Sequence, residues 1–237
     1  MGTNTSQHIS QQFEKELQDI RSRVLAMGGL VEQQVADALS ALMTGDAELA
    51  RKVIIQDTQV NTMEILIDEE CVQIIALRQP TAGDLRLVTA IFKTITDLER
   101  IGDEAQSIAQ RALNLAVADR PKKNYRELST LGNHARGMLR DALNAFARLD
   151  VDAALSIAKE DSARDDEYES IIRQLMTYMM EDPRSISNVM DLIWSARSIE
   201  RIGDHAHNLC EYVIYLVEGM DVRHLSVEKM KEVLDRD

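Results

Sequence analysis

Apolar residues recur at intervals of three and four along almost the whole chain, which is the spacing of one face of an α-helix. The first series runs from Ile9 to Leu42, the second from Val53 to Ile74 and the third from Leu87 to Leu115. Strict alternation of apolar and polar residues, which typifies a half-buried strand, is sustained nowhere. The pattern therefore predicts three long helices in the first half of the chain.

Glycine, proline and cap residues mark where these helices end. Gly45 suits the position after a helix, and Asp46 suits the N-cap of the next one. Pro80 ends the second series. Gly28 and Gly29 interrupt the first series, and they predict either a close approach by another helix or a bend.

The same pattern then starts again in the second half. A fourth series runs from Leu128 to Ala145, a fifth ends before Pro183, and a sixth runs from about Asn188 to Glu218. One more short helix is expected from Ser226 to Leu234, because Val227, Met230 and Leu234 share one side.

An internal repeat links the two halves. The segment Glu-Arg-Ile-Gly-Asp at 99–103 recurs at 200–204, 101 positions later. The helices before it align at a spacing of 104, which matches Asp57 with Asp161. Because the match lies at equivalent points of two three-helix units, we predict an all-α fold of two tandem, antiparallel three-helix bundles. The first bundle covers residues 1–120 and the second covers 121–237 with a C-terminal tail, and the polar segment 119–124 joins them.

Composition supports long helices and narrows the function. The chain of 237 residues has only 3 Pro, 10 Gly and 4 % aromatic residues, which disfavours a β-sandwich or barrel. Lys and Arg number 27 against 40 Asp and Glu, so the formal charge is −13. Such an acidic chain lacks the basic surface that binds nucleic-acid phosphates, but it suits a protein that holds cations. No apolar run is long enough to insert into a membrane, and two cysteines in helical series favour a reducing compartment.

Carboxylates spaced four residues apart carry the candidate chemistry. Positions i and i+4 lie one turn apart on the same face of a helix, where two like charges repel unless something neutralises them. If the second and third helices of each bundle are neighbours, each half gathers four oxygen-bearing side chains, the ligand set that Mg²⁺, Mn²⁺ or Fe prefers. The first candidate metal cluster consists of Asp57, Asn61, Glu99 and Asp103, and the second of Asp161, Asp165, Glu200 and Asp204.

Several details qualify this cluster hypothesis. Asn61 supplies a neutral oxygen, so the first cluster should bind a cation more weakly. Gly102 and Gly203 each cost a helix about 1 kcal/mol against alanine, and close helix approach is the reason we expect for them. Two alternatives stay open: acidic residues on helices are often solvated surface, and Arg100 and Arg201 could neutralise these carboxylates.

Other catalytic constellations are not recognisable in the sequence. His205 and His207 are expected to be polar surface residues, because positions i and i+2 do not converge on one face. Neither Glu99 nor Glu200 begins the E-x-x-H motif of di-iron carboxylate enzymes, because Gly102 or Gly203 stands where the histidine should be. The sequence has no H-E-x-x-H, no phosphate-binding P-loop and no dinucleotide fingerprint.

The sequence resembles the PhoU family of bacterial regulators of phosphate uptake and phosphate signalling. The segments that carry the resemblance are Asp68–Cys71, Gln79–Leu87, Leu98–Asp103, Leu175–Asp182 and Arg197–Asp204, and they span nearly the whole chain. The repeated E(D)xxxD motif is the hallmark of that family, whose fold is two three-helix bundles. Some members carry multinuclear iron, zinc or another divalent metal at these motifs and others carry none, so the resemblance leaves the metal (Fe, Zn, Mn or Mg) and its occupancy open. Asn61 departs from the acidic residue of some relatives.

The resemblance also implies a function. It implies a cytoplasmic, usually dimeric, non-enzymatic adaptor that associates peripherally with inner-membrane complexes. Such an adaptor acts between the phosphate-specific ABC transporter and a sensor histidine kinase, and it keeps the phosphate-starvation response off when phosphate is plentiful. Two other classes remain as alternatives: a carboxylate-bridged metal oxidoreductase or metal store, and a purely structural helical spacer.

Overall fold

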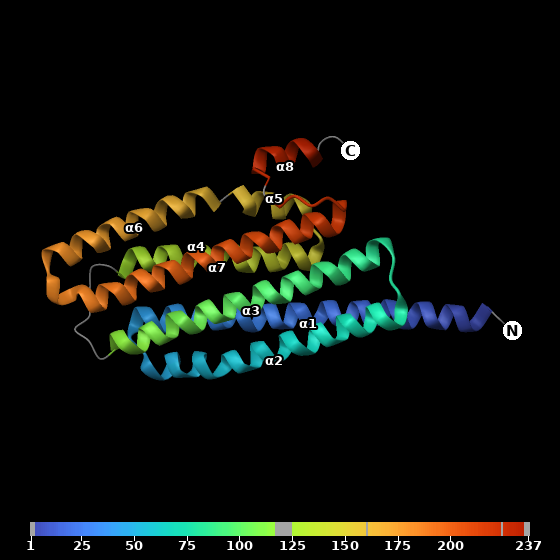
Figure 1. Cartoon of the computed structure of the whole chain (residues 1–237), viewed down its shortest axis with the longest axis horizontal. Coiled ribbons are helices and arrows are strands. Elements are labelled where there is room, and N and C mark those ends of the chain that lie inside the picture. The colour runs from blue at the N-terminus through green and yellow to red at the C-terminus, as the bar shows by residue number, and fades with distance from the viewer. Residues whose placement is uncertain (1–2, 117–124, 160, 224, 235–237) are drawn as a thin grey trace.

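The structure, a computed structural model, describes residues 3–116, 125–159, 161–223 and 225–234, and every element in these ranges is helical (Figure 1). Side chains are not described at 3–10, 161–165, 227, 228, 233 and 234. The all-α prediction is confirmed.

The first half folds into three long helices, as the apolar series predict. These are α1 (Thr3–Thr44), α2 (Ala47–Arg78) and α3 (Ala82–Ala116). Gly45 takes a left-handed conformation with φ of 75°, which a glycine adopts without strain. The Asp46 side chain accepts a hydrogen bond of 3.0 Å from the Leu49 amide, so it caps α2 as expected.

The second half repeats this arrangement. Its helices are α4 (Tyr125–Arg148), α5 (Val151–Lys159), α6 (Asp161–Glu181), the short turn η1 (Pro183–Ser185), α7 (Ile186–Glu218) and α8 (Val227–Leu234). α5 ends at Lys159 and α6 begins at Asp161, and residue 160 between them lies outside the described residues. The predicted tail helix is confirmed as α8.

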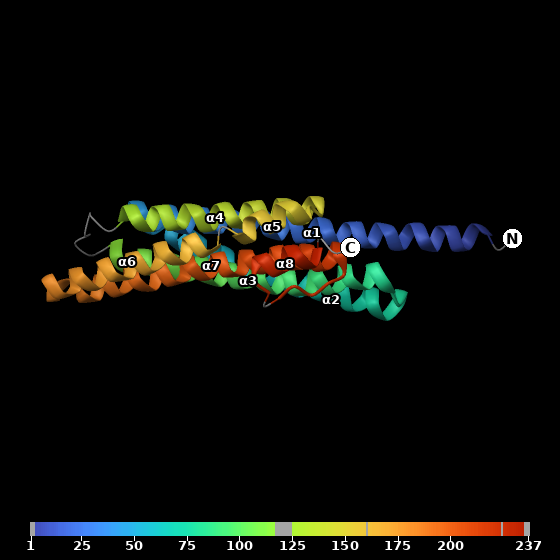
Figure 2. The ribbon, with the colours of Figure 1, turned by 90° about the horizontal axis from the view of Figure 1, so that it is seen from above.

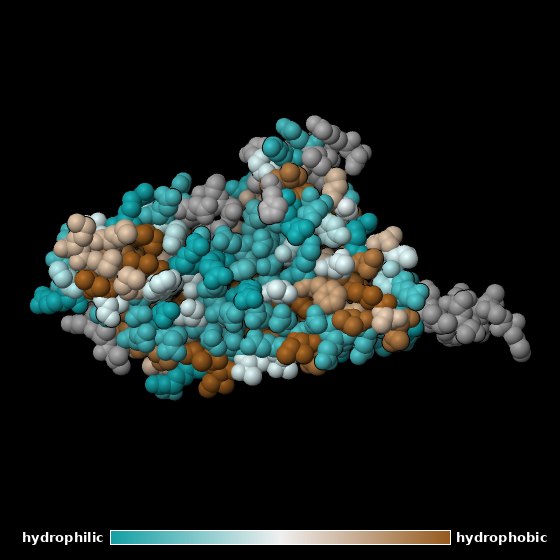
Figure 3. Space-filling model, in the orientation of Figure 1, coloured by the Kyte–Doolittle hydropathy of each residue, from teal (hydrophilic) through white to brown (hydrophobic). Residues whose placement is uncertain are grey.

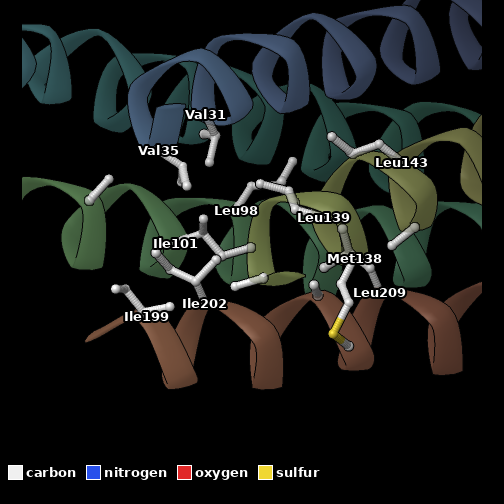
Figure 4. Close-up of a cluster of buried hydrophobic side chains, with 14 of the residues drawn as sticks. Val31, Val35, Leu98, Ile101, Met138, Leu139, Leu143, Ile199, Ile202 and Leu209 are labelled. Atoms are coloured by element: carbon white, nitrogen blue, oxygen red, sulfur yellow. The ribbon is translucent and has the colours of Figure 1, made fainter. Parts of the chain in front are cut away.

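The two halves lie side by side, with α3 and α7 making the most extensive contact between them. Figure 1 shows α2 along the lower edge of the molecule and α6 along the upper edge, and Figure 2 shows α4 along one edge with α7 and α3 beneath it. Side chains from α1, α3, α4 and α7 meet in the middle, among them Val35, Ile101, Leu139 and Ile202 (Figure 4). All four are buried, and one cluster of buried apolar residues runs through both halves. The predicted joint at 119–124 lies outside the described residues, and the domain boundary stays a prediction.

Two glycines reveal how α1 and α4 approach each other. A Cβ added at Gly28 would lie 2.4 Å from Cδ2 of Leu143, and one added at Gly132 would lie 2.7 Å from Cδ2 of Leu39. Gly132 and Leu143 stand 104 positions after Gly28 and Leu39, the spacing of the sequence repeat. The contact is therefore reciprocal, as a pseudo-twofold relation between the halves requires. Of the two readings of Gly28, close helix approach is correct, and α1 continues through it.

The surface is mostly polar, with apolar patches at α2 and near the junction of α6 and α7 (Figure 3). The most exposed large apolar side chains are Ile55 and Leu77 on α2 and Met180 on α6, between 74 % and 83 % exposed. Within the described ranges, no helix is long and apolar enough to cross a membrane.

Candidate metal centre

Asp57 lies at the centre of the first candidate cluster. Its side chain on α2 is only 3 % exposed. It accepts hydrogen bonds from Gln34 Nε2 on α1 at 3.0 Å, from Gln106 Nε2 on α3 at 3.2 Å and from its own helical neighbour Asn61 Nδ2 at 3.4 Å. Three helices therefore converge on one buried carboxylate, and amide donors offset part of the cost of burying its charge.

The absent side chain of Gly102 makes room for this convergence. A Cβ at Gly102 would lie 3.3 Å from Asp57 Oδ1, from Gln34 Oε1 and from Val60 Cγ1. Alanine would press on all three, so glycine at this position lets α3 approach α1 and α2 closely. The expectation that Gly102 serves close helix approach is confirmed.

The α3 carboxylates of the cluster lie at its more solvated side. Burial and the carboxylate of Asp103 raise the pKa of Glu99, with a further contribution from Glu64. Burial and the carboxylate of Asp57 raise the pKa of Asp103 in turn. Arg100 approaches both but stays at 3.6 and 3.8 Å, too far for a close hydrogen-bonded pair. The negative charges of the first half therefore repel one another and are only weakly neutralised by the chain.

Glu64 belongs to this group, although the sequence prediction does not include it. Burial is the main cause of its raised pKa, followed by repulsion from Asp68, and Asp103 adds to it. Glu64 stands seven residues after Asp57, two helical turns along the same face of α2. That spacing is the signal that would have identified it.

The second candidate cluster is described only in part. Glu200 on α7 is 13 % exposed and accepts two hydrogen bonds from Arg197 Nη1, at 2.9 and 2.8 Å. Asp204 lies one turn further along α7 and is partly buried. The side chains of Asp161 and Asp165 lie outside the described residues, so their part in the cluster stays a prediction.

The polar atoms of the first half suit a divalent cation. Gln34 Oε1 and Asn61 Oδ1 are buried oxygen atoms without a hydrogen-bond partner, and a cation would satisfy such acceptors. Asp57 and two or three further carboxylates supply negative charge, and oxygen donors match Mg²⁺ or Mn²⁺. Among the described residues no three His, Cys, Asp or Glu side chains already converge in a metal-binding group. The residues fit a site in which every protein ligand is an oxygen atom, supplied partly by carboxylates and partly by the side-chain amides of Gln34 and Asn61.

A second polar network ties the two halves together, and the sequence prediction missed it. His205 Nδ1 on α7 lies 2.6 Å from Asp97 Oδ1 on α3, and Asn208 Nδ2 donates to the same oxygen at 3.3 Å. Arg201 pairs with Glu104 at 2.6 Å across the same interface. These side chains cross-link α3 and α7.

The expectation that His205 and His207 are surface residues is therefore wrong. Their side chains are only 17 % and 18 % exposed: His205 faces Asp97 across the interface between α3 and α7, and His207 lies 3.7 Å from Glu211 on its own helix. The signal lies in the repeat itself: His205 aligns with Glu104, and Asp97 aligns with Ser198. Positions where the repeats differ thus meet across the interface between the halves.

Comparison with known proteins identifies the fold and the family. The PhoU domain profile matches residues 24–112 and 128–213. The chain is 56 % identical to the phosphate-specific transport system accessory protein PhoU homolog of Pseudomonas putida, covering 94 % of this chain and 87 % of that protein. It is 51 % identical to the accessory protein PhoU of Escherichia coli K12, covering 98 % and 95 %.

Solved structures agree with this result. The crystal structure of PhoU from Pseudomonas aeruginosa superposes with a TM-score of 0.86 at 54 % identity, covering 88 % of this chain and 100 % of that one. PhoU from Streptococcus pneumoniae, a phosphate transport system regulatory protein, gives a TM-score of 0.82 at 32 % identity, covering 89 % and 99 %. The chain belongs to the PhoU family.

Proposed function

We propose that this protein is an accessory regulator of phosphate uptake. Its membership of the PhoU family carries the proposal, because relatives more than half identical over nearly the whole chain are named accessory proteins of the phosphate-specific transport system. Such accessory proteins are not enzymes, and this chain acts by binding. It represses the phosphate-starvation response when phosphate is plentiful, as an adaptor between the phosphate ABC transporter and a sensor histidine kinase.

Charge supports a membrane-protein partner on the cytoplasmic side. The chain carries a formal charge of −13, and cytoplasmic loops of membrane proteins are enriched in Lys and Arg. Complementary fields speed encounter and select partners, and salt screens them. We therefore place the protein in the cytoplasm, peripherally attached to the transporter complex. Its association with reconstituted transporter should weaken as salt is raised, and binding that is insensitive to salt would contradict this assignment.

The carboxylate clusters are the proposed regulatory element. We propose that each binds a divalent metal, with Asp57, Asn61, Glu99 and Asp103 in the first half and Asp161, Asp165, Glu200 and Asp204 in the second. A bound cation would supply the positive charge that Arg100 supplies only weakly to Glu99 and Asp103. The chain holds the cluster through Asp57, whose contacts reach α1 and α3.

We further propose that the protein acts as a homodimer. Exposed apolar side chains on α2, such as Ile55 and Leu77, support self-association of a chain that otherwise presents a polar surface. Sedimentation equilibrium at micromolar concentration tests this proposal, and a monomer across the whole range would reject it.

A complementation experiment tests the function. A strain that lacks the gene receives the wild type or a variant with Glu99, Asp103, Glu200 and Asp204 replaced by alanine, and a phosphate-starvation reporter is read in high phosphate. The control replaces four exposed carboxylates, Glu14, Glu69, Glu169 and Glu181, which gives the same change in net charge. We expect derepression with the first variant and repression with the second.

The two parts of the proposal fail in different ways. Deletion without derepression would reject the regulatory role. Full repression by the cluster variant would be compatible with the regulatory role but would show that the four carboxylates are not needed for it.

A further inference from the structure

The first candidate cluster contains a residue from α1 that has no counterpart in the second half. Gln34 is fully buried, with an exposed fraction of 0 %. The position 104 residues later is Met138, which is also buried and lies among the apolar side chains shown in Figure 4. At this point of the core the second half places a methionine, whereas the first half retains an amide that costs free energy to bury.

Only one of the two polar atoms of the Gln34 side-chain amide has a hydrogen-bond partner. Its Nε2 donates to Asp57 Oδ1 at 3.0 Å. Its Oε1 is buried and has no hydrogen-bond partner. A buried acceptor without a hydrogen-bond partner destabilises the folded chain, so a ligand that occupies this oxygen removes that penalty.

The unpartnered oxygen belongs to an amide that contacts Asp57, the buried carboxylate of the candidate centre. Gln34 Oε1 and Asp57 Oδ1 both lie 3.3 Å from the point where a Gly102 side chain would begin. Asn61, also on α2, contributes a second buried and unpartnered amide oxygen beside Asp57. Two neutral, unpartnered oxygens therefore accompany the buried carboxylate of Asp57, one of them packed against the backbone of Gly102.

We propose that Gln34 is a ligand of the cation bound by the first cluster and coordinates it through Oε1. This inference rests on the metal binding proposed above. Gln34 holds Asp57 through its nitrogen and presents its oxygen to the ion, so α1 joins α2 and α3 in the site. A neutral carbonyl oxygen adds coordination without adding charge, which suits a hard cation such as Mn²⁺ or Mg²⁺.

The proposal also explains why a carboxylate-only description of the site is incomplete. Among the described residues, the acidic and imidazole side chains do not form a group of three around one point. Amide oxygens from Gln34 and Asn61 add two donors beside Asp57, and water would complete the six ligands of an octahedral ion.

The test compares two substitutions in a chain whose second cluster has been disabled. Glu200→Gln and Asp204→Asn define this parent, so that Mn²⁺ titration followed by electron paramagnetic resonance reports the first cluster alone. Gln34→Met takes the residue that the second half uses at the same buried position, so the fold should tolerate it. Gln34→Glu keeps an oxygen donor at the site but loses the amide donor to Asp57.

We expect Gln34→Met to weaken Mn²⁺ binding about tenfold or more, the scale of losses seen when groups supporting a metal site are removed. Gln34→Glu should bind at least as tightly as the parent. Thermal unfolding gives an independent readout: Mn²⁺ should raise the melting temperature of the parent and of Gln34→Glu, and raise that of Gln34→Met much less.

Other outcomes reject the proposal in distinguishable ways. If Gln34 serves only as a hydrogen-bond donor to Asp57, Gln34→Met lowers stability without metal but leaves the Mn²⁺ affinity unchanged. That result rejects the ligand role of Gln34 and leaves the proposed metal binding in place. If the parent binds no Mn²⁺, the proposed metal function of the first cluster fails, and the inference fails with it.

Discussion

The two halves of the chain share one apolar framework and differ in the polar residues built on it. On the first helix of each half, positions separated by 104 residues are buried in both copies, from Val24 and Leu128 at one end to Leu42 and Phe146 at the other. The reciprocal contacts of Gly28 and Gly132 belong to this framework. Packing in a dense core is felt at the level of single methylene groups, so both copies need apolar groups of suitable shape at these positions.

The polar residues of the two halves have diverged further. In the first half Asp57 is surrounded by the amides of Gln34, Asn61 and Gln106. In the second half Glu200 is held by Arg197, and the position equivalent to Arg197 in the first half is Thr96. The difference teaches that the framework positions two helices for a carboxylate cluster, while each half neutralises its charges by its own means.

Truncation at the equivalent core positions Leu42 and Phe146 should have the largest effect. Leu→Ala substitutions in cores cost about 2–5 kcal/mol and Phe→Ala about 3–5 kcal/mol, and both side chains are fully buried. We therefore expect both variants to lose several kcal/mol of unfolding free energy in urea titrations, with Phe146→Ala the less stable.

The shape of the unfolding curve sharpens the comparison between the halves. Because one buried cluster runs through both, each variant should shift a single cooperative transition followed by circular dichroism. Two transitions, with each variant moving only one, would show that the halves are independent folding units.

The interlocking glycines should give the next largest effect. Alanine at residue 28 or 132 must displace the δ-methyl groups of Leu143 or Leu39; overpacking costs about 1–3 kcal/mol, and the higher helix propensity of alanine offsets up to about 1 kcal/mol of it. Gly28→Ala should be the more destabilising, because its Cβ contact is 2.4 Å against 2.7 Å.

Neighbouring glycines provide the control for this pair. A Cβ at Gly29 or Gly137 would meet nothing within 4 Å. Alanine there should stabilise the helix by up to about 1 kcal/mol. Equal effects at residues 28 and 29, measured by chemical denaturation, would contradict the close approach of α1 and α4.

The sequence predicted the framework well for a physical reason. Burial on one face of a helix imposes a period that can be read from one chain, so α1, α2, α3, α4 and α7 were predicted.

The candidate site was predictable only within each helix. The i, i+4 rule finds Glu99 and Asp103 because they share a helix, and the repeat points to Asp57. Gln34 was missed because an amide among apolar residues of α1 carries no periodic signal of what it faces on other helices. His205 and Asp97 were missed for the same reason, since their contact depends on how α3 packs against α7.

The smallest predicted effect has opposite signs in the two halves. Glu99 and Asp103 are like charges one turn apart, and such pairs cost about 0.2–0.5 kcal/mol. Glu99→Gln should therefore stabilise the metal-free chain by about this amount at pH 7. Glu200→Gln relieves the same repulsion from Asp204, but it also breaks two charge-assisted hydrogen bonds with Arg197, which are stronger than that repulsion, so it should destabilise the chain by a few tenths of a kcal/mol.

The pH dependence of the Glu99→Gln effect follows from the raised pKa of Glu99. The folded chain binds this proton more tightly than the unfolded chain, whose carboxyl titrates near the ordinary value of 4.5. Below that value both states are protonated and the carboxyl costs nothing; the cost appears as the pH rises through the folded-state pKa. The gain from Glu99→Gln should thus be present at pH 7 in a chelator and vanish near pH 4, as measured by urea unfolding. A gain of the same size at both values, or the same sign for Glu99→Gln and Glu200→Gln at pH 7, would mean that the two halves do not differ in how they neutralise their carboxylates.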